Sequence, residues 1–128
     1  DYRNQESNAR RCFENVLDMD IDHDNAKSYR GFAMMTLGQK PQADTWMERV
    51  LTTTDDHNGE INYLGACYYA QAGDKDKAFR CMENSLSKGY ANYYNWTVNS
   101  EGGINVAPLR SDSRFDELLK KHSALFGR

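Results

Sequence analysis

Small and apolar side chains recur along this chain at the spacing of one helical face, and the same spacing occurs three times. The three sets share identical internal intervals: Ala9-Cys12-Phe13-Val16-Leu17, Ala43-Trp46-Met47-Val50-Leu51 and Ala78-Cys81-Met82-Ser85-Leu86. Their starts are offset by 34 residues (43−9) and then by 35 (78−43). A period near 34 residues is typical of stacked helix-turn-helix units, each of which buries its apolar face against its neighbours.

The repeat predicts where the helices lie. In the second repeat we expect a first helix over 25–37, ended by Gly38, which adopts the left-handed conformation without a Cβ clash. Pro41 then opens a second helix, where its missing N–H costs nothing. Three further stretches follow the same plan and are expected to be helical: 5–17, 61–72 and 75–88. Gly73 and Gly89 end the last two of these.

The residues after the third repeat break the period and are expected to close the array. The aromatic stretch 90–98 predicts a short helix that covers the last repeat. The segment 108–119 predicts a final helix with Ser111 or Asp112 as its N-cap. The apolar residues expected to form the stripe of this helix are Phe115, Leu118, Leu119 and Leu125.

We therefore expect one domain over 1–128 with a repeat organisation. Its parts are the second helix of a partial first repeat (1–22), repeat two (23–57), repeat three (58–90) and capping helices (91–128). Ala43 and Ala78 are expected where two helices touch, and Phe13, Met47 and Met82 on the buried seam.

Several residues of this plan carry a family resemblance. The order Gly31, Gly38, Ala43, Met47 recurs as Ala66, Gly73, Ala78, Met82: a small residue within the first helix, a glycine at the turn, then a small and a bulky residue in the second helix. This pattern resembles the tetratricopeptide repeat over residues 4–90. The closing segment looks like the end cap of some bacterial arrays of that family. The resemblance implies an all-α, right-handed superhelix.

The same resemblance implies a function and a site. Such superhelices bind a protein or an extended peptide on the concave face made by successive first helices. By the repeat phase, the residues on that face are Asn25, Ser28, Phe32, Met35, Glu60, Tyr63, Cys67 and Gln71. We expect Phe32, Met35 and Tyr63 to be partly accessible to solvent. A clamp for a terminal carboxylate is disfavoured, because the family's cationic positions hold Ser28, Phe32, Glu60 and Tyr63 instead.

Composition and charge narrow the classes of partner. The 128 residues carry a net charge of −3, which argues against general affinity for nucleic acid or for anionic membranes. No apolar run approaches the roughly 18 residues that would span a bilayer. The chain begins Asp1-Tyr2-Arg3, as expected of a processed or excised fragment. A regulatory or scaffolding domain of a larger enzyme therefore remains the alternative function.

The cysteines favour a structural role. Cys12, Cys67 and Cys81 are odd in number and lack paired spacing. Cys12 and Cys81 occupy the repeat position held by Trp46, which predicts packed free thiols in a reducing compartment such as the cytoplasm. A metal site or a disulfide network is the less favoured alternative.

The sequence has few candidate metal-binding or catalytic residues. The alternating aspartates of 18–24 suggest a calcium loop, but His23 stands where the loop needs glycine and Tyr29 where it needs glutamate. The three histidines, His23, His57 and His122, lack the spacing of a zinc site. We therefore expect no metal, no cofactor and no enzymatic activity. The triplet 95–97, Asn-Trp-Thr, fits the N-glycosylation pattern and matters only in a secreted eukaryotic chain.

The amino-terminal edge is expected to be incomplete. Repeat one contributes Ala9, Phe13, Val16 and Leu17 but lacks its own first helix. An uncovered apolar edge of this kind predicts contact with a preceding domain or self-association.

Overall fold

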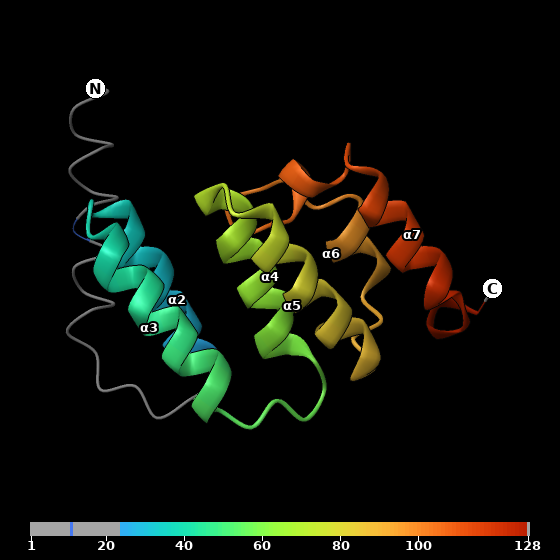
Figure 1. Ribbon diagram of the computed structural model, residues 1–128, viewed down its shortest axis with the longest axis horizontal. Helices are drawn as coiled ribbons and strands as arrows, with labels where there is room; N and C mark the ends of the chain where they lie inside the picture. The colour runs from blue at the N-terminus through green and yellow to red at the C-terminus, as the bar shows by residue number, and fades with distance from the viewer. Residues whose placement is uncertain (1–10, 12–23, 128) are drawn as a thin grey trace. The chain divides into compact units, whose positions relative to one another are not determined.

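The computed structural model describes residue 11 and residues 24–127, and within these ranges every regular element is a helix (Figure 1). In chain order these are α2 (Asp24–Thr36), α3 (Lys40–Thr53), α4 (Glu60–Ala72), α5 (Lys75–Ser87), α6 (Tyr93–Thr97), the 3₁₀ helix η1 (Ala107–Leu109), α7 (Ser113–Lys121) and the 3₁₀ helix η2 (Ser123–Phe126). The expected all-α class is confirmed for these residues. The chain divides into two compact units, Asp1–Thr54 and Asp55–Arg128, each described by itself.

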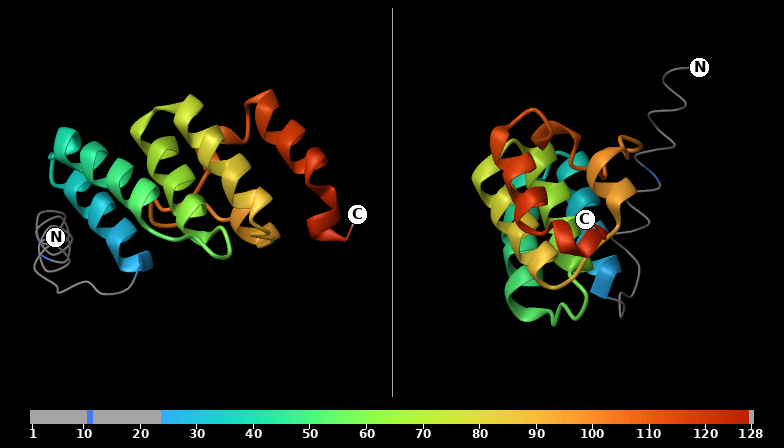
Figure 2. Two further views of the ribbon diagram at one scale, coloured as in Figure 1. Left: turned by 60° about the horizontal axis from the view of Figure 1, so that its bottom comes forward. Right: turned by 90° about the vertical axis from the view of Figure 1, so that its right-hand side faces the viewer.

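In the first unit, α2 and α3 form a helical hairpin in which the two helices run side by side (Figure 2). Gly38 ends α2 with a φ of 81°, and the N–H of Gln39 donates to the carbonyl of Met34 at 2.9 Å. Pro41 lies in the first turn of α3. Both ends of α2 and the start of α3 thus lie within a residue of the predicted positions, because local turn chemistry sets them.

Small residues let α2 and α3 approach closely. A Cβ added to Gly31 would collide with the Sδ of Met47 and lie 2.8 Å from its Cγ. Ala43 and Met47 are both fully buried. The predicted burial of these two residues is confirmed, whereas Phe13, its counterpart in repeat one, lies outside the described residues.

In the second unit, α4 and α5 form a matching hairpin (Figure 2). Gly73 ends α4 with a φ of 86°, and the next residue, Asp74, caps α5 by accepting the N–H of Lys77 at 3.2 Å. Ala78 and Met82 are fully buried, as the repeat predicts. α4 is the central helix of this unit, because every residue over 61–70 is buried.

The carboxyl-terminal segments pack onto this hairpin. α7 contacts α5, while η1 contacts both α4 and α5. Asp112 caps α7 by accepting the N–H of Arg114 at 3.0 Å, and Phe115 is buried. Two expectations need correction: the helix predicted over 90–98 spans only Tyr93–Thr97, and Leu125 lies in η2 with 37% of its surface exposed. α7 ends at Lys121, so Leu125 does not extend the α7 stripe.

The Asp112 cap predicts a pH effect on stability. Hydrogen bonds from the Arg114 guanidinium, and then from the Arg114 N–H, lower the pKa of Asp112 to about 2. A carboxyl group with a lowered pKa contributes stability that is complete above its unfolded pKa of about 3.9 and is lost as the pH falls to its folded value. We expect the stability difference between wild type and Asp112→Asn to shrink as the pH falls from about 4 to about 2. Urea denaturation across this range measures it, and a difference that stays constant would contradict the assignment.

Candidate functional site

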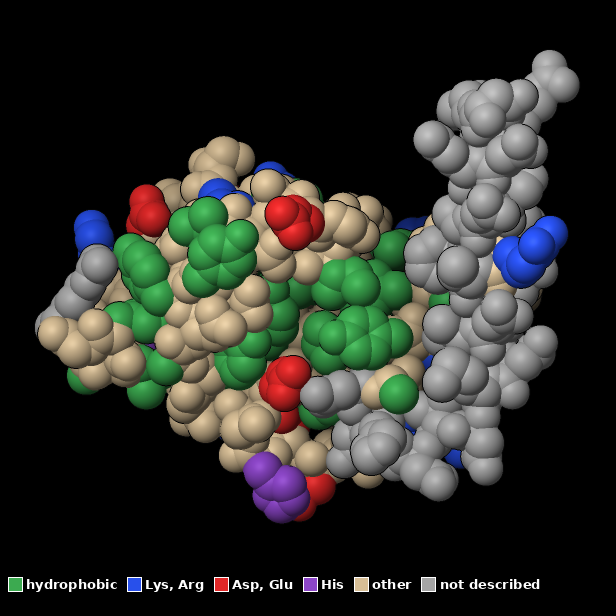
Figure 3. Space-filling model, turned by 180° about the vertical axis from the view of Figure 1, so that it is seen from behind, with side chains coloured by type: hydrophobic (Ala, Val, Ile, Leu, Met, Phe, Trp, Pro, Cys, Tyr) green, Lys and Arg blue, Asp and Glu red, His purple; other side chains and the backbone are tan. Residues whose placement is uncertain are grey.

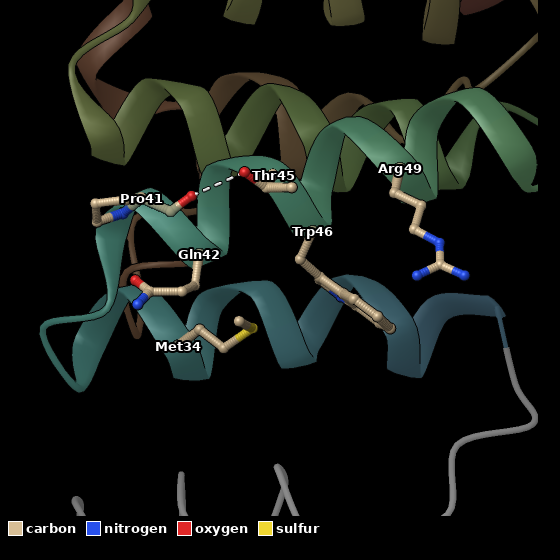
Figure 4. Close-up of a pocket in the computed structure, with 6 residues that line it drawn as sticks. All are labelled: Met34, Pro41, Gln42, Thr45, Trp46 and Arg49. Carbon is tan, nitrogen blue, oxygen red and sulfur yellow. Dashed lines mark hydrogen bonds between the residues drawn. The ribbon is translucent and has the colours of Figure 1, made fainter.

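Two adjoining cavities open on the first unit, with volumes of about 450 and 180 Å³. The larger is lined by Met34, Pro41, Gln42, Thr45, Trp46 and Arg49 (Figure 4). The smaller is lined by Lys27, Trp46, Arg49, Val50, Thr53 and Thr54. Both cavities share Trp46 and Arg49 in their linings, and we call the pair of cavities the Trp46 groove. Its larger part falls within the size range of ligand pockets.

Trp46 is fixed in place by α2. Its indole Nε1 donates to the carbonyl oxygen of Lys27 at 2.7 Å, and the Arg30 guanidinium carbon lies 4.8 Å from the ring centroid. Figure 4 shows the indole reaching from α3 across to α2, between Met34 and Arg49. The side chain is half-buried, so part of the ring remains at the surface. Trp46 is therefore a rigid aromatic group already positioned for contact.

The charged side chains that line the groove are cationic. Lys27 and Arg49 are the charged members of the described lining, and Arg30 stacks on the central indole. The Nε of Arg30 is buried without an acceptor among the described residues. The nearby acid Asp44 accepts a hydrogen bond from Lys40 at 2.9 Å. The described lining of the groove thus combines apolar side chains with charged residues that are cationic.

The structure corrects the expected exposure of the concave face in the first unit. Phe32 is 4% exposed and Ser28 is fully buried, although both were placed on an accessible surface. The reason is that Ser28 and Phe32 share a stripe with Gly31, the residue at the closest approach to α3. Met35 is half-buried, in agreement with the prediction. Asn25 lies in the first turn of α2.

A similar correction applies to the second unit. Tyr63 is 4% exposed and Cys67 is fully buried. Tyr90 stacks on Tyr63 with ring centroids 4.8 Å apart, and Trp96 meets Tyr63 edge-on at 4.9 Å. The aromatic residues of 90–98 therefore cover the last repeat as expected, and in doing so they cover the tyrosine that was assigned to the binding face.

The remaining residues of the expected site, Gln71 and Glu60, differ in how far they are exposed to solvent. Gln71 is exposed, yet its amide donates to the backbone and side-chain oxygens of Asn105 at 3.1 and 3.2 Å. This bond ties α4 to the carboxyl-terminal segment. Glu60 is half-buried in the first turn of α4. Whether a partner binds these residues stays a prediction.

The two described thiols are buried. Cys67 and Cys81 are free and buried, as predicted, and burial raises the pKa of each to about 12. A thiol with such a pKa is protonated near neutral pH and is a poor nucleophile or metal ligand. Cys12 lies outside the described residues, as do the aspartates 18–22 and the apolar edge residues of repeat one.

Other candidate chemistry in the described part of the chain is also limited. His57 is exposed and lies 3.4 Å from the Asp55 carboxylate. Over residue 11 and residues 24–127, no three His, Cys, Asp or Glu side chains gather as a metal site would require. Asn95 of the glycosylation triplet is half-buried, and its amide nitrogen donates to the Tyr90 hydroxyl at 3.0 Å. Among these same residues, no helix has the length and apolar character needed to cross a bilayer.

A second apolar surface lies on the carboxyl-terminal segments. Tyr93 and Tyr94 of α6 are 40% and 55% exposed, and the Tyr93 ring contacts Phe126 at 5.3 Å. Figure 3 shows hydrophobic side chains reaching the surface in this part of the molecule. Because Tyr94 is an exposed aromatic residue outside the first unit, it provides a matched control for Trp46.

The Trp46 groove was not predicted from the sequence. The repeat places Trp46 where the other repeats have cysteine, which predicts a buried apolar residue. A signal was nevertheless present, because tryptophan exceeds cysteine in size and Arg30 and Arg49 belong to the same repeat. A large ring at a position where the other repeats have a small side chain indicates that part of the ring extends out of the contact between the two helices.

The chain was compared with models of protein families, with curated proteins and with solved structures, and no match was found. Inference about its function therefore depends on its own residues and their geometry.

Proposed function

We propose that this chain is a non-catalytic interaction module that binds a peptide segment of a protein partner in the Trp46 groove. The proposal keeps the tetratricopeptide-like, right-handed superhelix as its architecture. Two helical hairpins with glycine turns at equivalent positions, Gly38 and Gly73, support that architecture. The buried, protonated thiols support binding as the function in preference to catalysis.

The observation that carries the proposal is the fixed, half-exposed indole of Trp46 beside two open cavities. Tryptophan and arginine are the residues most enriched among those that dominate binding energy at protein interfaces. Trp46 is held by Lys27 and Arg30, so little side-chain entropy is lost when a partner binds. The proposed contact surface thus moves from the first helices alone to the face shared by α2 and α3.

Selection of peptides from a random library displayed on phage tests the function. We expect the full chain to enrich peptides that lose at least tenfold in affinity on Trp46→Ala, in line with a hot-spot residue. The matched variant Tyr94→Ala removes an exposed aromatic ring from α6 and should leave the affinity unchanged. Circular dichroism of both variants confirms that they fold. Enriched peptides that bind Trp46→Ala as well as wild type would show that the groove is not the site.

A further inference from the structure

We propose that the segment bound in the Trp46 groove is an acidic peptide with an apolar anchor residue. This inference rests on the proposed function and specifies the chemistry of its partner. The anchor would contact Met34, Pro41 and Trp46, and the acidic residues would lie near Lys27 and Arg49.

Charge complementarity carries the argument. Arg49 lines both cavities and Lys27 lines the smaller one, and no acidic residue is found among the described residues that line either cavity. The Arg49 and Arg30 guanidinium groups form no ion pair with the described residues, and the buried Nε of Arg30 adds an unsatisfied donor next to the indole. Carboxylates match guanidinium donors in geometry and charge, so an acidic segment meets both requirements.

The apolar part of the groove explains why the ligand needs an apolar anchor residue in addition to its acidic residues. If the ligand were purely ionic, the apolar surface of Met34, Pro41 and the exposed part of Trp46 would remain in contact with water. An anchoring Leu or Phe removes that surface from water, and the burial of apolar surface favours binding. The polarizable thioether of Met34 accommodates either side chain.

A protein partner fits better than a nucleic acid. Tight nucleic-acid binding needs many phosphate contacts, whereas the described lining of this groove has two cationic residues, with Arg30 on the indole, in a chain of net charge −3. A base could still stack on Trp46 beside Arg30, so an oligonucleotide belongs among the ligands tested.

The experiment measures binding to the full chain by fluorescence anisotropy of labelled synthetic peptides. The probe has glutamates flanking a Leu-Phe pair, and its neutral counterpart has glutamine in place of each glutamate. We expect the acidic peptide to bind at least tenfold more tightly than the neutral one, and its affinity to fall as salt is added. Arg49→Glu should weaken the acidic peptide at least tenfold and favour a lysine version of it. Lys88→Glu is a matched charge reversal at an exposed residue of the second unit and should change neither affinity.

Each other outcome overturns the proposal in a distinct way. Equal binding of the acidic and neutral peptides, while peptides selected by display still depend on Trp46, removes the acidic partner but leaves the proposed function. Tighter binding of oligothymidylate than of the acidic peptide, lost in Trp46→Ala, assigns the groove to single-stranded nucleic acid. A third comparison tests the acidic segment 18–22 of the chain as a competitor for the groove. If the acidic peptide binds only after Asp18, Asp20 and Asp22 are changed to Asn, the groove is occupied within the chain and not by a partner.

Discussion

Replacing Gly59 with alanine should destabilise the second unit by about 2–5 kcal/mol, the largest effect we expect from a single added methyl group. Gly59 has a φ of 86°, a conformation that strains any residue with a Cβ atom. The added Cβ would also collide with the carbonyl oxygen of Ser85 and lie 3.0 Å from the Cβ of Tyr90. Ser85 has little freedom to move, because it is fully buried and its hydroxyl donates to the carbonyl of Gly59 at 2.7 Å.

Gly73→Ala provides the control for this prediction. Gly73 has the same φ of 86°, but no atom lies within 4 Å of the position its Cβ would occupy. The variant should therefore show the backbone cost alone, about 1–2 kcal/mol. Urea denaturation, followed by the near-ultraviolet circular dichroism of the buried Trp96, measures both variants. Equal losses would show that the collision with Ser85 contributes nothing.

Replacing Asp56 with alanine should cost about 2–4 kcal/mol, because it removes the cap of α4. The Asp56 carboxylate is buried and accepts the N–H groups of Gly59, Ile61 and Asn62 at 3.1, 3.1 and 2.9 Å. It also accepts the side-chain amide of Asn62 at 2.7 Å. Without it, donors at the start of a buried helix lose their acceptor, and a negative charge is lost from the positive end of the helix dipole.

The neighbouring acid gives a control for the loss of the α4 cap. Asp55 is exposed and its carboxylate lies 3.4 Å from the exposed His57 ring, so Asp55→Ala should change stability by less than about 1 kcal/mol. The same denaturation measurement compares the two variants. If Asp56→Ala is as stable as Asp55→Ala, water satisfies the freed donors and the cap is not needed for α4.

The sequence was sufficient for features that depend on local chemistry. The ends of α2 and α4 follow from Gly38 and Gly73, since glycine adopts positive φ at no steric cost. The burial of Ala43, Met47, Ala78 and Met82 follows from spacing along a single helix. Of the two residues proposed to cap α7, Asp112 rather than Ser111 accepts the N–H, but both stand at the right place in the chain.

Features that join segments distant in the sequence required the tertiary structure. Phe32 and Tyr63 look like exposed groove residues from the repeat phase, yet both are buried. Helical phase tells which residues share a face, but not which segment covers that face; for Tyr63 the covering rings are Tyr90 and Trp96. The cap of α4 by Asp56 depends on the path of the connector after α3, which no local pattern predicts.

In the Trp46 groove, too, some features follow from the sequence and others only from the packing of α2 against α3. The sequence alone determined that Trp46 lies on α3 and faces the seam between two helices. It could not determine that the ring is too large to be enclosed there, because that depends on the space Gly31 and Met47 leave between α2 and α3. Nor could it place Arg30 over the indole and Lys27 and Arg49 at its edges. Those positions arise only when the helices pack, since side chains far apart in sequence then share one surface.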